Sequence, residues 1–164
     1  MKLNGSHVYP VAVDRVIAML ADKSATTEKY QEMGHRDVAI LEFEADADVL
    51  RIKSTRVVEV DLPGFAKKVL KPTNTMVQTD EWRRQDDGSW VGTFGAEVKG
   101  SPVKIEGTML LTPEGDGCRH EVTIDVQVKI PIVGGKIADW AGKNDVRATL
   151  DAEFAFNERR LSPA

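Results

Sequence analysis

Hydrophobic and polar residues near the N-terminus recur with the period of about 3.6 that is typical of an amphipathic helix. A first helix is predicted over residues 11–21, whose apolar face carries Val13, Val16, Ile17 and Leu20. Residues 3–9 come before it and form a short predicted strand that ends at Pro10. A second helix is predicted over residues 25–33, because Gly34 stands where a glycine commonly ends a helix.

The period changes to two from residue 35 onward, which predicts strands. Six extended segments follow one another, separated by turns: 38–44, 49–60, 74–84, 89–98, 104–112 and 119–132. In the last segment, alternate positions from Val122 to Ile132 are apolar, and most of the positions between them are polar. This alternation predicts a strand with one face against apolar material and the other against water.

A helical period returns after Gly134-Gly135 and continues to about residue 161. Roughly 27 residues at about 1.5 Å each predict a helix of about 40 Å. Gly142 and Asn144 are weak helix formers, and we expect a bend at this point.

The predicted order of elements is one strand, two helices, six strands and one long helix, an α+β arrangement. With 164 residues and no Pro/Gly/Ser-rich linker, the chain is expected to form a single domain over residues 1–164. The antiparallel sheet of six to seven strands must cover its apolar face, and the C-terminal helix is its only long cover. We therefore expect a strongly curved sheet wrapped around that helix, with an internal apolar cavity.

Composition narrows the function classes. The chain has 22 Lys and Arg against 26 Asp and Glu, a net charge of −4, so nothing attracts it overall to nucleic acid or anionic lipid. No apolar run reaches the roughly 20 residues of a membrane span, so stable membrane insertion is not expected. Cys118 is the only cysteine, and the N-terminus lacks the apolar stretch of a signal peptide. Both features favour the cytoplasm.

Several short segments act as family landmarks. They are Tyr9-Pro10, Gly34, Leu62-Pro63-Gly64-Phe65, Gln78-Thr79-Asp80-Glu81-Trp82, Asp87-Gly88 and the segment 128–137 that opens the last helix. With these landmarks the chain resembles the START/SRPBCC superfamily, the helix-grip fold that includes the birch pollen allergen. The resemblance covers essentially the whole chain and is strongest to actinobacterial members of unknown function. It implies an apolar cavity for lipids, sterols, polyketides or other hydrophobic molecules.

Catalytic and cofactor signatures do not emerge from the sequence. The three histidines lack metal-ligand spacing, so no metal is predicted. Gly134-Gly135-Lys136 is not a P-loop, because Ile137 follows the lysine. No G-x-S-x-G motif is present. We therefore assign no catalytic residue and no cofactor.

Polar residues on the apolar parity of a strand are candidates to point into a cavity. Arg56, Asp80 and His120 fit this description. A buried charge is costly unless it is paired, so an inward Arg56 needs a carboxylate or a polar ligand group. Asp80 is one candidate partner. The alternative is a bulge or rim position that returns these groups to water.

Apolar candidates for the cavity lining are more numerous. The alternative interpretation is that these residues form a fully packed core with no cavity. The residues expected to line a space between sheet and helix, with Phe65 closing one mouth, are Phe65, Trp82, Trp90, Phe94, Met109, Val126, Val128, Ile130 and Trp140.

Three functions compete on this basis. The leading hypothesis is a binding or carrier protein for a small hydrophobic molecule such as a lipid, sterol or polyketide. The second is an enzyme of the cyclase/aromatase or hydratase kind that uses Arg56, Asp80 or His120 in the same cavity. The third is a regulatory module that binds another protein, whose identity the sequence does not indicate.

Overall fold

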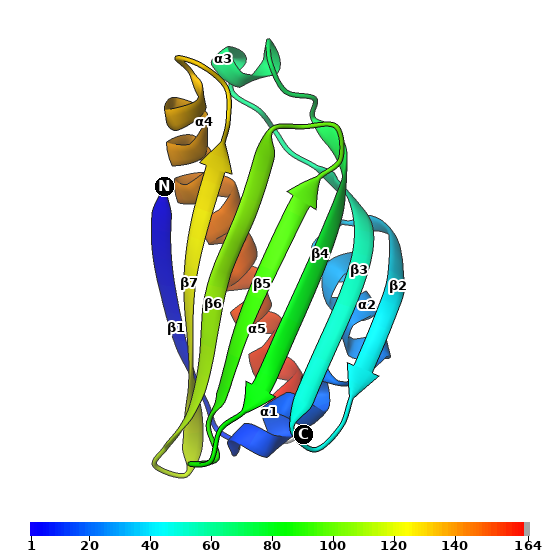
Figure 1. Ribbon diagram of the computed structural model, residues 1–164, viewed down its shortest axis with the longest axis vertical. Coiled ribbons are helices and arrows are strands. Elements are labelled where there is room, and N and C mark those ends of the chain that lie inside the picture. Colours follow the sequence, from blue (N-terminus) through cyan, green and yellow to red (C-terminus); the bar gives the residue numbers. More distant parts are fainter. Residues whose placement is uncertain (163–164) are drawn as a thin grey trace.

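Seven antiparallel strands form one curved sheet in a computed structural model that describes residues 1–162 (Figure 1). The spatial order of the strands is β1-β7-β6-β5-β4-β3-β2. Only β1 leaves chain order, because it pairs with β7 at the far edge. The bounds are β1 Lys2–Tyr9, β2 Arg36–Ala45, β3 Val49–Glu59, β4 Thr73–Arg84, β5 Trp90–Val98, β6 Val103–Glu114 and β7 Gly117–Val128.

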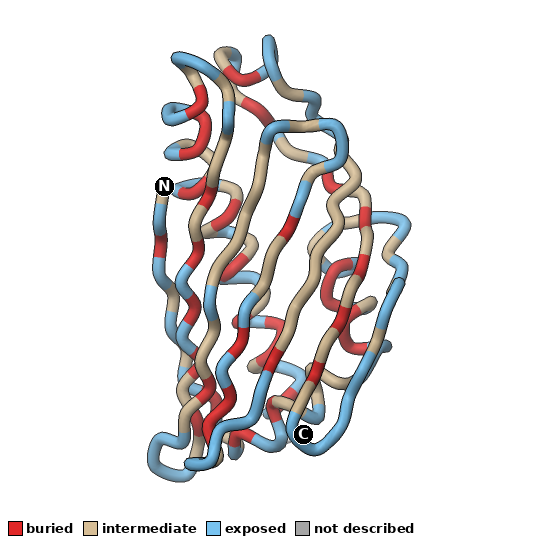
Figure 2. The backbone as a smooth tube through the Cα atoms, in the orientation of Figure 1, coloured by how far each residue is buried: buried red, intermediate tan, exposed pale blue. Residues whose placement is uncertain are grey.

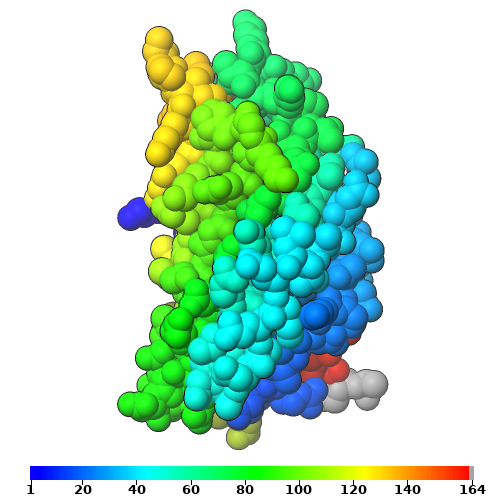
Figure 3. Space-filling view, turned by 45° about the vertical axis from the view of Figure 1, so that its right-hand side comes forward, coloured from blue at the N-terminus to red at the C-terminus, as the bar shows by residue number. Residues whose placement is uncertain are grey.

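The helices lie on one face of this sheet, as Figure 1 shows. Helices α1 (Val13–Leu20) and α2 (Lys23–Glu32) follow β1, and the short α3 (Gly64–Lys67) connects β3 to β4. In the space-filling view of Figure 3, residues coloured cyan to yellow-green, the range that contains the central strands, form most of the visible surface. The predicted α+β order, with its strongly curved sheet, is confirmed.

The C-terminal helix is continuous but contains a wider turn. Helix α4 (Gly134–Ala141) runs into the π-helical segment η1 (Gly142–Val146) and then into α5 (Arg147–Leu161). The irregular turn falls where the sequence predicted a bend. Gly142 also permits a close approach to β1, since a Cβ there would lie 2.9 Å from the Met1 side chain. A π-turn in a long helix is often found at a functional site.

Burial alternates along the inner strands as the sequence predicted (Figure 2). On β3 the even positions from Leu50 to Val58 are buried and the odd ones are half-buried. On β7 the even positions from Cys118 to Val126 are buried. Three polar residues, Ser54 and Arg56 on β3 and His120 on β7, follow the same parity and are buried with their apolar neighbours.

The last strand is shorter than its pattern predicted. It ends at Val128 rather than at residue 132, so Ile130 and Ile132 do not belong to the sheet. Pro131 has no backbone N–H to donate to a neighbouring strand. Ile132 adopts φ = 72° and its side chain is fully exposed. The apolar alternation therefore continues past the point where the strand stops.

Two apolar clusters form the interior. The large one joins the sheet to α1 and α5, and it contains Leu50, Trp82, Trp90, Val126 and Phe154 among others. The smaller one lies beside α3 and α4 around Leu62, Ala66 and Ile137. None of the helices within residues 1–162 is long and apolar enough to cross a membrane.

Candidate ligand cavity

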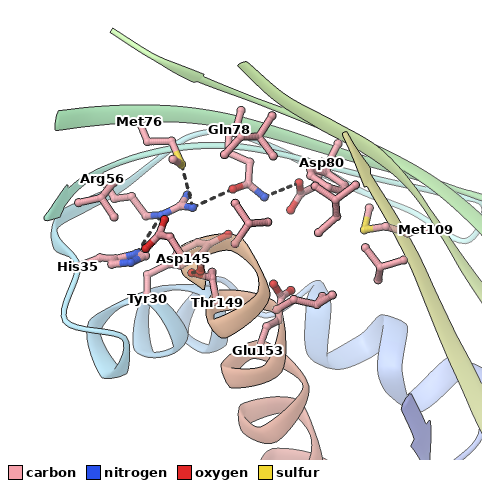
Figure 4. Close-up of a pocket in the computed structure, with 18 of the residues that line it drawn as sticks. Tyr30, His35, Arg56, Met76, Gln78, Asp80, Met109, Asp145, Thr149 and Glu153 are labelled. Carbon is pink, nitrogen blue, oxygen red and sulfur yellow. Dashed lines mark hydrogen bonds between the residues drawn. The ribbon is translucent and has the colours of Figure 1, made fainter. Parts of the chain in front are cut away.

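A cavity of about 100 Å³ lies between the sheet and the C-terminal helix (Figure 4). Its apolar wall comes mainly from the sheet and consists of Val58, Met76, Phe94, Ala96, Ile105, Met109, Val122, Ile124, Val146 and Leu150. Its polar lining comes from α2, the turn that follows it, β3, β4, β7 and the C-terminal helix. It consists of Tyr30, His35, Arg56, Gln78, Asp80, His120, Asp145, Thr149 and Glu153. The expected apolar cavity therefore has one polar side.

Arg56 dominates the polar side, because its guanidinium is almost completely removed from water. The residue is 4% exposed. Its Nε donates to His35 Nδ1 at 3.1 Å, and its Nη2 donates to Gln78 Oε1 at 2.9 Å. The guanidinium also stacks on the Tyr30 ring, with its carbon 3.8 Å from the ring centroid. Its Nη1 is buried without a hydrogen-bond partner.

Gln78 connects Arg56 to Asp80. The Gln78 amide accepts from Arg56 through Oε1 and donates to Asp80 Oδ1 through Nε2 at 2.8 Å (Figure 4). Burial is the main cause that raises the pKa of Asp80, although the hydrogen bond from Gln78 opposes it. The predicted Arg56–Asp80 pair thus exists only through an intervening neutral amide.

A buried ion pair fixes α2 to α5 beside the cavity. Lys29 Nζ donates to Glu153 Oε1 at 3.0 Å, and the Lys29 side chain is 7% exposed. Burial alone favours the neutral forms, but the attraction between the two charges outweighs it. The pKa of Lys29 is accordingly raised and that of Glu153 lowered. Both groups therefore stay charged near neutral pH.

His120 is enclosed by aromatic rings on the other side of the cavity. Asn157 Nδ2 donates to the Tyr9 hydroxyl at 3.0 Å, and that hydroxyl lies 3.1 Å from His120 Nδ1. Because the hydroxyl oxygen accepts from Asn157, its own proton is available for Nδ1, and the ring hydrogen then sits on Nε2. Burial lowers the pKa of His120 to about 4. His120 Nε2 is buried without a partner.

Five of the residues singled out from the sequence line the cavity: Arg56, Asp80, His120, Phe94 and Met109. Three others do not, although they point to the same face of the sheet. Trp82, Trp90 and Val126 are at most 3% exposed and belong to the large packed cluster. Trp82 leaves no free space toward β5, since a Cβ on Gly92 would lie 2.8 Å from its ring.

The remaining four candidates are not among the residues that line the cavity. Phe65, Val128, Ile130 and Trp140 pack around the small cluster beside α3 and α4. Phe65 is not among the residues that line the cavity, and the Lys136 ammonium lies 4.1 Å from the centroid of its ring. Ile130 lies beyond the end of β7 and has no place on the sheet wall.

Sequence reasoning missed most of the polar lining. On the C-terminal helix, Thr149 and Glu153 follow Asp145 at a spacing of about four residues, on the same stripe as Leu150 and other apolar positions. Because residues about four apart lie on the same face of a helix, this spacing could have predicted that the three side chains point inward. Gln78 shares the parity of Asp80 and was equally readable. Tyr30 and His35 gave no periodic signal, because they flank the turn between α2 and β2.

Comparison with known proteins places the chain in a family. A family described as "Protein of unknown function (DUF2505)" matches residues 4–161. The chain belongs to the DUF2505 family. Uncharacterized proteins of Mycobacterium tuberculosis (strain H37Rv) and Mycobacterium bovis are each 26% identical to this DUF2505 chain over 84 residues. The match covers 50% of this chain and 48% of theirs, so the chain spans about half the length of these relatives.

Solved structures show the same fold over nearly the whole DUF2505 chain. TTHA0849 from Thermus thermophilus has a TM-score of 0.69 at 18% identity, covering 98% of this chain and 97% of that one. Ara h 8.0201 has a TM-score of 0.63 at 10% identity, covering 98% and 97%. A START superfamily protein from Mycobacterium smegmatis has a TM-score of 0.55 at 16% identity, covering 98% and 96%. The chain has the START-like helix-grip fold, as its sequence landmarks implied.

Proposed function

We propose that this protein binds and carries a small hydrophobic molecule in the cavity between the sheet and the C-terminal helix. The observation that carries the proposal is the cavity itself, with its continuous apolar wall. Ordinary cores are packed to a density that leaves few voids larger than a water molecule. A START-like fold, which commonly binds hydrophobic ligands, supports the same reading by analogy.

The size of the cavity restricts the guest. Ligand pockets for drug-sized molecules usually measure about 300–1,000 Å³, whereas an engineered apolar cavity of about 150 Å³ takes up benzene. The cavity here measures about 100 Å³. Met76 and Met109 line it, and methionine side chains adjust readily to a guest. We therefore propose a guest with a short chain or a single ring rather than a sterol.

Methyl NMR on the full chain tests this proposal. Benzene and butan-1-ol are titrated while the methyl signals of Met76 and Met109 are followed. We expect saturable shifts of both signals. Ala96→Leu should abolish them, because Ala96 is buried and lines the cavity. Val91→Leu is the matched control on the same strand, since Val91 is 42% exposed outside the cavity. Absence of any saturable shift with both probes would refute the proposal.

An enzymatic role is the second candidate, because two titratable groups with shifted pKa values line one cavity. Burial raises the pKa of Asp80 and lowers that of His120. Such opposed shifts are common where acid and base catalysis occurs. Mass spectrometry of guests that copurify with wild type, Asp80→Asn and His120→Asn separates the two roles. A carrier retains the same guest in all three, whereas an enzyme accumulates an unconverted substrate in the variants.

A further inference from the structure

We propose that the guest is a monocarboxylic acid whose carboxylate binds the free Nη1 of Arg56. This inference rests on the proposed function and names the chemical class of its ligand. It starts from Arg56, the buried cation on the polar side of the cavity.

The charge of Arg56 has no direct counterion among the described residues. Its three side-chain acceptors are a histidine nitrogen, an amide oxygen and, 3.2 Å from Nη2, the Met76 sulfur. All three are neutral, and so is the Tyr30 ring beneath it. A buried cation is costly unless a negative group neutralises it. A bound anion would supply that missing charge.

Arg56 lines the cavity, and one of its nitrogens has no hydrogen-bond partner among the described residues. Nε and Nη2 hold the guanidinium in place, while Nη1 is buried and bonded to nothing. The stack on Tyr30 fixes the plane of the group. A planar guanidinium held in this way is pre-organised for a carboxylate oxygen, which forms short charge-assisted hydrogen bonds with it.

Three acidic residues share the cavity, and none of them fills this position. Glu153 is paired with Lys29 at 3.0 Å. Asp80 accepts from Gln78, which lies between it and Arg56. Asp145 makes no ion pair within residues 1–162 and lies half-buried on η1. The single unneutralised cation matches a monoanion better than a doubly charged phosphate.

Isothermal titration at pH 7 with acids and alcohols of matched shape tests this inference. The pairs are butyrate with butan-1-ol, and benzoate with benzyl alcohol. In wild type we expect each acid to bind about tenfold tighter than its alcohol, the size expected of one hydrogen bond to a charged group. Arg56→Gln should remove this preference while the alcohols still bind. Arg56→Lys should retain part of it, because the charge remains but the planar geometry does not.

Two further variants separate Arg56 from other charges. Asp80→Asn should leave acid binding equal or tighter, since it removes a nearby negative charge. Arg51→Gln is the matched control, because Arg51 lies on the opposite face of β3 and donates to Glu42. It should change nothing.

The outcomes distinguish this inference from the proposed function. Alcohols that bind wild type as tightly as the acids would overturn the carboxylate assignment and leave the cavity proposal intact. No binding of either acid or alcohol would overturn both. If Arg56→Gln does not fold, the acid-to-alcohol ratio of the wild type still decides the question.

Discussion

His120 should make the stability of this protein depend on pH between the ordinary pKa of a histidine and its lowered pKa in the folded protein. Its pKa falls from 6.5 to about 4 on folding, chiefly because burial removes the ring from water. Between these two values the unfolded chain binds the proton and the folded protein does not. Stability therefore decreases as the pH falls from 7 toward 4.

The two pKa values give the size of the effect. Between pH 7 and pH 5 the linkage amounts to about 2 kcal/mol of unfolding free energy from His120 alone. His35 acts with the same sign, since burial and then Arg56 lower its pKa to about 4 as well. Its contribution is smaller, because the side chain is only half-buried and water screens it.

Urea unfolding at pH 7 and pH 5 measures this loss. His120→Asn retains an acceptor for the Tyr9 hydroxyl but cannot titrate, so it should recover about 2 kcal/mol of the pH-dependent loss whatever its absolute stability. His7→Asn is the control, because His7 is a half-exposed histidine that pairs with Glu158 at 2.9 Å. This variant leaves His120 and its contribution to the pH dependence in place. If His120→Asn retains the wild-type loss, the assignment of this linkage to a neutral, buried His120 is wrong.

Three other predictions follow from packing and burial. Gly107→Ala should destabilise the protein by about 2 kcal/mol or more in urea unfolding, because its Cβ would lie 2.0 Å from a backbone oxygen on β7. The control is Gly95→Ala, whose Cβ would meet no atom within 4 Å. This control should change the unfolding free energy by less than about 0.5 kcal/mol. Tyr9→Phe should lower the melting temperature by roughly 6 °C, since two buried groups lose their shared hydroxyl. The Cys118 thiol should react with a disulfide reagent at pH 8 far more slowly in the folded protein than in urea, because burial raises its pKa to about 11. Equal stability of the two glycine variants would contradict the first prediction, and an unchanged melting temperature of Tyr9→Phe would contradict the second. Rapid modification of Cys118 in the folded protein would contradict the third.

Most of the site residues that the sequence predicted correctly were found from the alternation of inward and outward side chains along the strands. The alternation on β3, β4 and β7 was enough to place Arg56, Asp80 and His120 on the inner face, where they line the cavity. The same parity also selected Trp82 and Trp90, which are packed solid. Periodicity identifies the face of a strand. It does not say whether the space beyond that face is filled, because this depends on how close the helix comes in three dimensions.

The sequence pattern also did not show at which residue the last strand ends. The apolar pattern of β7 continues to Ile132, but the chain leaves the sheet after Val128, so Ile130 joins a different cluster. Pattern alone could not locate that exit, because a proline can stand at a strand edge as well as beyond it. The expected bend near Gly142 was easier to find, since weak helix formers signal an irregular turn without specifying that it is a π-turn.

Helix α2 shows why the polar side of the cavity needed the structure. Its buried residues are Ala25, Thr26, Lys29 and Tyr30, so it has little apolar surface with which to dock. Lys29 instead holds Glu153 on α5, and Tyr30 supports Arg56 on β3. Both contacts border the cavity, and they hold α2 against the sheet and the C-terminal helix through charge. Tyr30, Arg56 and Glu153 thus both position α2 and contribute to the polar lining. The guest proposed to neutralise Arg56 would therefore bind beside one of the contacts that keep this helix in place.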